Sequence, residues 1–162
     1  MRADDTHRPR RALLHDCFTS VFMPVRSDSD LASPTVLAAA ILATVERLGG
    51  HVSFVELCRE VDGFAGASAY ALRENLILWQ GVSEVASVAL DDLQRTRRLA
   101  FVACDRLVYF LDGQTLRLPV GKRRSHAYRR PTWYPVTVST PAQLEIHGSA
   151  LRQTRRSRHA RA

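Results

Sequence analysis

The sequence has little cysteine, almost no lysine and no long apolar run. Its three cysteines, Cys17, Cys58 and Cys104, form no Cys-x-x-Cys pair, so a disulfide framework is excluded and a zinc site would need distant ligands. No run approaches the roughly 18 apolar residues of a membrane span, and the N-terminus lacks the apolar stretch of a secretory signal. We therefore expect a cytoplasmic protein with reduced thiols and no membrane contact.

The motifs of common enzyme classes are also missing. The sequence contains no Walker loop, no Gly-x-Gly-x-x-Gly and no Gly-x-Ser-x-Gly. His15 and Cys17 are two residues apart, a spacing that places them on different faces of a helix and argues against a nucleophile–base pair. Four further histidines lie in separate segments without ligand spacing: His51, His126, His147 and His159. The sequence predicts no catalytic residue, no metal site and no cofactor.

Charge is present in excess but is unevenly placed. The net charge is +7, and Lys122 is the one lysine among 23 basic side chains. Counted by segment, residues 1–30 are neutral, residues 31–121 carry −2 and residues 122–162 carry +9. The basic character therefore belongs to the last quarter of the chain, where it favours a polyanionic partner.

Length and hydropathy predict one folded domain with tails. The chain has 162 residues, of which 46% are hydrophobic, enough for a real core. We expect an N-terminal arm with a short amphipathic helix at 1–32, a domain at 33–120, a basic and aromatic extension at 121–150, and a disordered Arg-rich tail at 151–162.

Four helices are expected before residue 96, at 34–48, 54–61, 67–80 and 84–95. Ser33-Pro34 is a typical helix start, with an N-cap residue followed by proline in the first turn. Ser53 and Glu56 have the spacing of a capping box. Ser83, after Gly81-Val82, is placed as the N-cap of the fourth helix.

Beyond Arg98 the apolar period changes from about 3.6 to 2, which favours strands. We expect strands at 99–103, 107–111 and 115–118, a first turn at Asp105-Arg106, and a hairpin turn at Asp112-Gly113. Val52 is expected to pair as a very short strand, and residues 136–138 as an edge strand.

This order of elements resembles the winged helix-turn-helix family of prokaryotic transcription regulators. The resemblance covers residues 34–118. It depends on a Gly-hydrophobic-Ser turn, an Ala-Leu pair with a further Leu, and an apolar strand pair: Gly81, Val82, Ser83, Ala89, Leu90, Leu93, Leu99, Val108 and Tyr109. It implies an α+β winged helix: three to four helices followed by a β-hairpin or three-stranded wing, with an N-terminal helical arm and a basic C-terminal extension.

The resemblance also implies a function. The helix at 84–95 would read the major groove of double-stranded DNA and the wing would contact phosphate or the minor groove, in a homodimeric bacterial transcription regulator without enzymatic activity. The expected DNA-binding residues on and beside that helix are Ser83, Glu84, Val85, Ser87, Val88, Asp91, Arg95, Arg97 and Arg98. Arg106 is expected at the wing tip, and Lys122, Arg123 and Arg124 in the basic extension.

The expected reading helix departs from the family pattern, because base edges and phosphates require donors and this face carries acids and valines. An alternative is a protein-interaction or dimerisation module whose basic tail binds nucleic acid non-specifically. Its partner would contact Val85 and Val88, or the amphipathic segment from Leu13 to Phe22. Trp133 and Tyr134, next to basic residues, also have the character of a platform for single-stranded bases.

Overall fold

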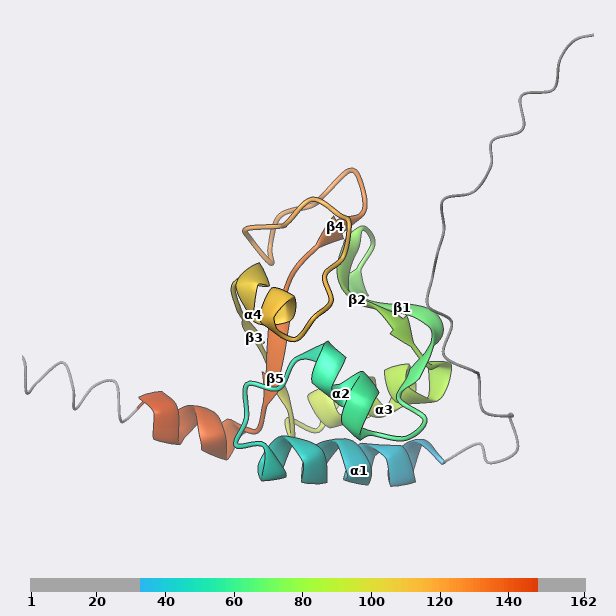
Figure 1. The fold of residues 1–162 in the computed structure, drawn as a ribbon, viewed down its shortest axis with the longest axis vertical. Helices are drawn as coiled ribbons and strands as arrows, with labels where there is room; N and C mark the ends of the chain where they lie inside the picture. The colour runs from blue at the N-terminus through green and yellow to red at the C-terminus, as the bar shows by residue number, and fades with distance from the viewer. Residues whose placement is uncertain (1–32, 149–162) are drawn as a thin grey trace, which may run out of the picture.

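The computed structural model describes residues 33–148, which form a mixed α+β fold of helices and two small sheets (Figure 1). The helices are α1 (Pro34–Arg47), α2 (Phe54–Glu60), α3 (Glu84–Arg95) and α4 (Arg106–Leu111), and residues 141–148 are also helical. The strands are β1 (Ala65–Arg73), β2 (Leu76–Val82), β3 (Ala100–Ala103), β4 (Thr132–Trp133) and β5 (Val136–Ser139). The predicted arm at 1–32 and tail at 151–162 lie outside the described residues.

Three of the four predicted helices are confirmed: α1, α2 and α3. The Ser53 hydroxyl accepts from the Glu56 N–H at 3.2 Å and the Glu56 carboxylate accepts from the Ser53 N–H at 2.9 Å, a complete capping box. The Ser83 hydroxyl accepts from the Ala86 N–H at 3.0 Å and begins α3. The predicted inward side of α3 is its buried side: Ala86, Ala89, Leu90 and Leu93.

The predicted helix at 67–80 is wrong, because this stretch forms the antiparallel hairpin of β1 and β2. Leu72, Leu76 and Trp79 have helical spacing, but Leu76 and Leu78 equally fit the alternation of a strand, and both are fully buried. Glu74-Asn75 makes the two-residue turn, in which Asn75 has φ 60°. Asparagine tolerates this left-handed conformation at low cost, so it was the local signal for a hairpin.

The predicted wing is also wrong beyond its first strand. Residues 100–103 form β3, but residues 106–111 form α4, whose N-cap Asp105 accepts from the Leu107 N–H at 2.8 Å. Asp112-Gly113 ends this helix instead of turning a hairpin. The Gly113 N–H donates to the Phe110 carbonyl at 3.1 Å, and Gly113 has φ 91°, the left-handed conformation that commonly ends a helix. Residues 115–118 form no strand.

The two sheets are joined through the segment after Pro131. β2 pairs with β4 in parallel to complete the order β1-β2-β4, and β5 pairs with β3 antiparallel. The predicted strands at Val52 and at 136–138 are confirmed, but 136–138 is not an edge strand, because it is buried and pairs with β3 on one side and with Val52 on the other. Since β4 and β5 are buried, the expected boundary between Val120 and Gly121 falls inside the folded unit.

Aromatic side chains occupy the space between the sheets and the helices. Trp79 stacks on Tyr109 with ring centroids 4.9 Å apart, and Trp133 meets Tyr109 edge-on at 5.1 Å. The Tyr109 hydroxyl donates to the Val136 carbonyl at 2.7 Å and accepts from the Phe54 N–H at 3.4 Å. One side chain of α4 therefore connects α2, β2 and β5.

Replacing Tyr109 with Phe tests this connection. Tyr109→Phe leaves the buried Val136 carbonyl and Phe54 N–H without this partner, so we expect the free energy of unfolding to fall by about 1–3 kcal/mol. Urea denaturation followed by tryptophan fluorescence measures the change. An unchanged midpoint would show that these two hydrogen bonds contribute no net stability.

Within residues 33–148, no helix has the length and apolar character required to cross a membrane.

Candidate functional site

The N-terminal turn of α3 uses its polar groups internally. The Ser83 hydroxyl donates to the Gly63 carbonyl at 2.7 Å while it accepts from the Ala86 N–H. The Ser87 hydroxyl donates to the Ser83 carbonyl at 3.1 Å, and Val85 packs against the core. Of the predicted contact residues, Ser83, Val85 and Ser87 are thus half-buried and occupied within the domain.

The exposed side of α3 is acidic. Glu84, Val88, Asp91 and Arg95 lie on it, and Arg95 forms an ion pair with Asp92. Asp91 accepts a hydrogen bond from the Tyr70 hydroxyl at 2.8 Å. Burial, followed by the Asp91 carboxylate, raises the pKa of Tyr70, so the phenol remains a neutral donor. A polyanion would meet repulsion and few free donors on this surface.

The other predicted cations are spread over the molecule. Arg97 and Arg98 are exposed just after α3. Arg106 is the first residue of α4 and not a wing tip, because the expected hairpin is absent there. Lys122, Arg123 and Arg124 are exposed in a long connection between α4 and β4.

That connection contains the densest positive charge among the described residues. We call residues 119–131 the basic loop. Its five cations are all exposed: Lys122, Arg123, Arg124, Arg129 and Arg130. The sequence has no acidic residue between Asp112 and Glu145. None of these five cations forms an ion pair with a carboxylate of residues 33–148, so their charge faces solvent uncompensated.

The basic loop has its own internal hydrogen bonds. The Tyr128 hydroxyl accepts from the Arg123 N–H at 3.1 Å and donates to the Arg123 carbonyl at 3.2 Å, and its ring meets His126 edge-on. Arg73, at the end of β1, donates to the His126 carbonyl at 2.9 Å. At the loop's base the Gly121 N–H donates to the Trp133 carbonyl at 2.8 Å. These contacts fix the cations on a defined backbone.

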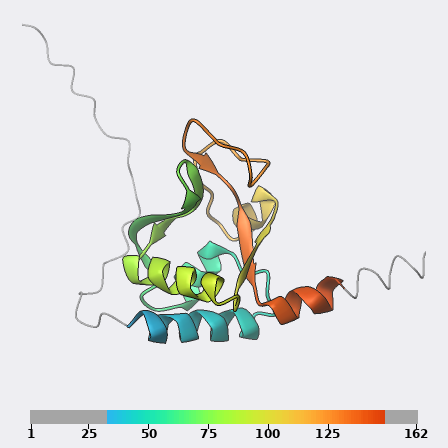
Figure 2. The same cartoon turned by 180° about the vertical axis from the view of Figure 1, so that it is seen from behind.

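The basic loop lies at one end of the molecule. In both views α1 and α3 form the opposite end, while the loop and the tip of the β1–β2 hairpin lie together at the top (Figures 1 and 2). The backbone of the loop therefore lies at the other end from α3, although Arg124 is near enough to Tyr70, the partner of Asp91, to act on its pKa.

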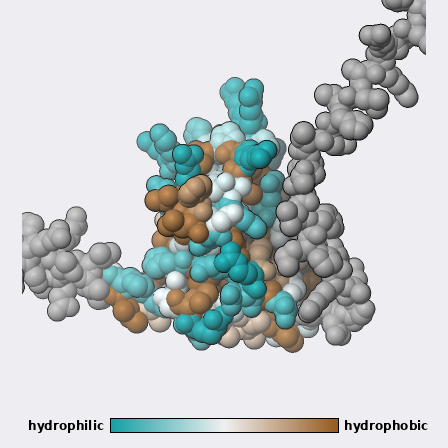
Figure 3. Space-filling view, viewed as in Figure 1, coloured by the Kyte–Doolittle hydropathy of each residue, from teal (hydrophilic) through white to brown (hydrophobic). Residues whose placement is uncertain are grey.

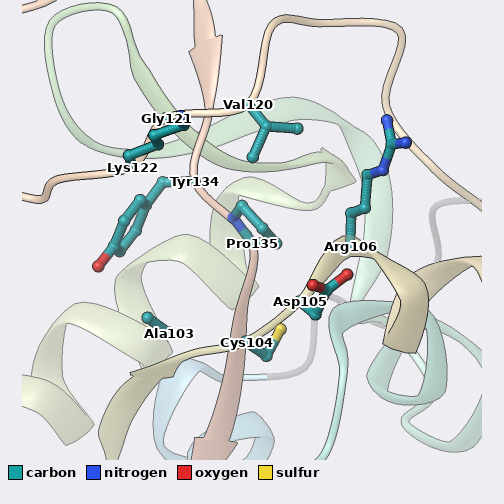
Figure 4. A pocket seen from close by; sticks show the side chains of 9 residues that line it. All are labelled: Ala103, Cys104, Asp105, Arg106, Val120, Gly121, Lys122, Tyr134 and Pro135. Carbon is teal, nitrogen blue, oxygen red and sulfur yellow. The ribbon is translucent and has the colours of Figure 1, made fainter.

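A hollow of about 420 Å³ opens beneath the basic loop (Figure 4). Its floor comes from the junction of β3 and β5, where the Cys104 N–H donates to the Pro135 carbonyl at 3.1 Å. The half-buried Tyr134 forms one wall, and Arg106 rises on the opposite side. The remaining lining residues are Ala103, Asp105, Val120, Gly121 and Lys122.

Cys104 in this floor is a poor nucleophile. Burial, with smaller effects from the nearby carboxylates of Asp105 and Asp112, raises the pKa of the thiol from 9.0 to about 11. Only the thiolate attacks, so the thiol is inert near neutral pH. Cys104 therefore supplies no ready nucleophile to this hollow near neutral pH.

Alkylation with iodoacetamide tests this conclusion. In a Cys17→Ser, Cys58→Ser background at about pH 8, we expect Cys104 to react about tenfold more slowly than an ordinary thiol. The raised pKa lowers the thiolate fraction about 100-fold, and the greater nucleophilicity of the more basic thiolate recovers part of that loss. Mass spectrometry gives the rate, and the same protein in urea is the control. Equal rates in the two states would contradict the raised pKa.

An apolar patch adjoins the hollow on α4. Leu107, Phe110 and Leu111 are 56%, 68% and 76% exposed, and they form the apolar surface over α4 in Figure 3. A second hollow of about 630 Å³ beside them has Leu116, Leu118 and Val120 in its lining. We call the three α4 side chains the α4 ridge.

No group of three His, Cys, Asp or Glu side chains that could hold a metal ion occurs within residues 33–148. Comparison of the chain with protein-family models, with curated proteins and with solved structures gives no match.

Sequence reasoning found the cations at 122–124 but missed the two hollows and the α4 ridge. Arg129 and Arg130 are not among the DNA contacts that the sequence predicts. The signal for α4 was Asp105, a good N-cap residue followed by Leu107-Val108-Tyr109, which was interpreted as a turn and a strand.

Proposed function

We propose that this chain is a DNA-binding protein that contacts the phosphate backbone through the basic loop. The supporting observation is the cluster of five exposed cations that have no carboxylate partner within the described residues. Four of the five are arginines, whose planar guanidinium groups fit phosphate oxygens in pairs. Because Tyr128 and Arg73 hold the loop in place, binding a phosphate there orders little additional backbone.

The role of a DNA-binding regulator is retained in this proposal, but the contact surface is changed. A helix-turn-helix requires a helix before the turn at Gly81-Val82-Ser83, and here the strand β2 ends at Val82. The exposed side of α3 is acidic as well. We therefore assign the phosphate contacts to the basic loop, with the Arg-rich residues 152–161 as a further sequence-independent contribution.

The test compares two triple variants with equal loss of charge in the full chain. The loop variant is Lys122→Gln, Arg123→Gln, Arg124→Gln, and the control is Arg95→Gln, Arg97→Gln, Arg98→Gln at the end of α3. Fluorescence anisotropy measures duplex binding at several salt concentrations. We expect the loop variant to reduce the salt slope by up to about three and the affinity by about 100-fold, since each phosphate contact contributes about 0.9 to that slope.

The control variant should stay within a few-fold of the unmodified protein. The opposite result, a loss confined to the α3 variant, would return the contact to the predicted recognition helix. Loss confined to a variant of the C-terminal tail, Arg152→Gln, Arg155→Gln, Arg156→Gln, would also contradict the proposal. Circular dichroism verifies that each variant keeps its fold.

The α4 ridge favours a second candidate function, self-association into a homodimer. Two-fold contacts are the commonest in soluble oligomers and require one surface that complements itself. The ridge of Leu107, Phe110 and Leu111 next to a 630 Å³ hollow meets this requirement, because the ridge of one copy can enter the hollow of the other. The predicted Val85/Val88 surface meets it less well, as Val85 packs against the core.

Sedimentation velocity over a range of concentrations tests the dimer. We expect the unmodified chain to dimerise and Phe110→Ser, Leu111→Ser to stay monomeric. Val36→Ser, Ile146→Ser is the matched control, because Val36 and Ile146 are 63% and 67% exposed on other helices. A monomer at every concentration, or equal weakening by both variants, would rule out the α4 ridge as the interface.

A further inference from the structure

The geometry points to the hollow beneath the basic loop as a binding site for one unstacked base of single-stranded DNA, held against the ring of Tyr134. This inference rests on the proposed DNA-binding function. It specifies which form of DNA binds at the end of the molecule that carries the basic loop. It makes single-stranded or frayed DNA, rather than an intact duplex, the preferred ligand.

The backbone explains why Tyr134 is available for this contact. Successive side chains of an extended segment point in opposite directions. Trp133 is fully buried and its indole N–H donates to the Leu78 carbonyl at 3.0 Å, whereas Tyr134 is half-buried and lines the hollow. The Tyr134 N–H donates to the Ile77 carbonyl at 2.8 Å, so the residue is fixed to β2. An aromatic ring on a fixed backbone is a stacking platform.

The size and lining of the hollow also fit a planar aromatic ligand. A volume of about 420 Å³ lies within the range of small-molecule sites, roughly 300–1,000 Å³. Val120, Pro135 and Ala103 supply further apolar surface to the lining of the hollow (Figure 4). Cys104 in the floor is neutral, because burial raises its pKa.

The charges around the hollow orient a nucleotide. Lys122 lies on the upper rim beside Tyr134 and Arg106 on the far side, so the phosphates on either side of the base can each meet a cation (Figure 4). Asp105, in the lower part, repels phosphate and favours entry of the uncharged base. Lys122 belongs to both the basic loop and the hollow, which makes one continuous path for a strand.

Bases in an intact duplex cannot reach the hollow, because they are stacked and paired. Single-stranded DNA offers its bases without that cost, while the phosphate contacts of the basic loop are available to both forms. The hollow therefore raises the affinity for single-stranded DNA above that for duplex DNA. The basic loop contributes equally to the affinity for both forms.

The experiment measures binding of the full chain to single-stranded and blunt duplex DNA of equal length by fluorescence anisotropy at several salt concentrations. Tyr134→Leu removes the ring and keeps apolar bulk; Tyr134→Phe is the matched control that keeps the ring. We expect Tyr134→Leu to weaken single-strand binding about tenfold, as for loss of one stacked base, with no change in duplex affinity or in the salt slope. Tyr134→Phe should bind like the unmodified chain.

A second variant addresses the site without altering Tyr134. Ala103 is exposed at the end of β3 and lines the hollow, so Ala103→Leu narrows the hollow at a position where folding tolerates a larger side chain. It should reproduce the selective loss of single-strand affinity. If both Tyr134→Leu and Ala103→Leu leave single-strand binding unchanged, or weaken duplex binding equally, the inference is overturned.

The two proposals fail in different ways. If the Lys122/Arg123/Arg124 variant binds both forms of DNA as well as the unmodified chain does, the proposed function fails and the inference fails with it. If that variant loses affinity and salt slope for both forms while the hollow variants are unaffected, the basic loop binds DNA and only the base site is wrong.

Discussion

Trp133→Ala is expected to lower the free energy of unfolding by about 4 kcal/mol, the typical cost of removing a large buried aromatic side chain. Trp133 is 1% exposed, packs edge-on against Tyr109 and lies 6.2 Å from the Trp79 ring. The substitution also leaves the Leu78 carbonyl without the indole N–H that donates to it. Since domains of this size are stable by about 5–15 kcal/mol, a large part of the protein's stability depends on a residue outside the predicted domain.

Urea denaturation followed by far-ultraviolet circular dichroism measures this loss. Val36→Ala, at an exposed position on α1, is the control and should change the free energy by less than about 0.5 kcal/mol. Trp133→Phe should fall between the two, because it keeps most of the ring but not the N–H. A loss below about 1 kcal/mol for Trp133→Ala would mean that β4 contributes little to the stability of the domain. The folded domain would then end near residue 120, as the sequence predicts.

The helical part of the fold could be predicted from the sequence because its signals are local. Ser53 and Glu56 satisfy each other within one turn, and Ser83 caps α3 with its own hydroxyl, so three- to four-residue spacing was sufficient. The hairpin of β1 and β2 is different. Its choice between helix and strand depends on the pairing of β2 with β4 and on the stacking of Trp79 against Tyr109 of α4, both more than twenty residues later in the chain.

The structure separates the predicted site residues by exposure and charge, and whether any of them binds DNA stays a prediction. Lys122, Arg123 and Arg124 are exposed, as a basic segment with little apolar character requires. The resemblance to a helix-turn-helix points to the α3 surface only if a helix precedes Gly81, and the element there is the strand β2. The hollow could not be predicted, since the pairing of Val120 with Trp133, more than ten residues apart in the chain, is what brings Tyr134 next to Lys122.

Gly66→Ala is the second substitution for which we expect a large effect, about 3 kcal/mol of lost stability. A Cβ at Gly66 would lie 2.5 Å from the Ser83 Cα and 2.7 Å from the Ser83 nitrogen, both backbone atoms that cannot move independently. The Ser83 N–H donates to the Phe64 carbonyl at 2.8 Å at the same crossing. The methyl group would therefore separate the start of β1 from the start of α3.

The control is Gly113→Ala, a glycine-to-alanine change with open space around the new methyl group. Gly113 has φ 91°, so alanine there is strained in its backbone but meets no atom within 4 Å, and we expect a smaller loss, about 1 kcal/mol. Thermal unfolding of both variants gives the comparison. If Gly66→Ala costs no more than Gly113→Ala, the close approach of β1 to Ser83 does not exist in solution, and the capped start of α3 is held by its own hydroxyl alone. If the larger loss is found, the hairpin that replaced the expected helix is what positions α3.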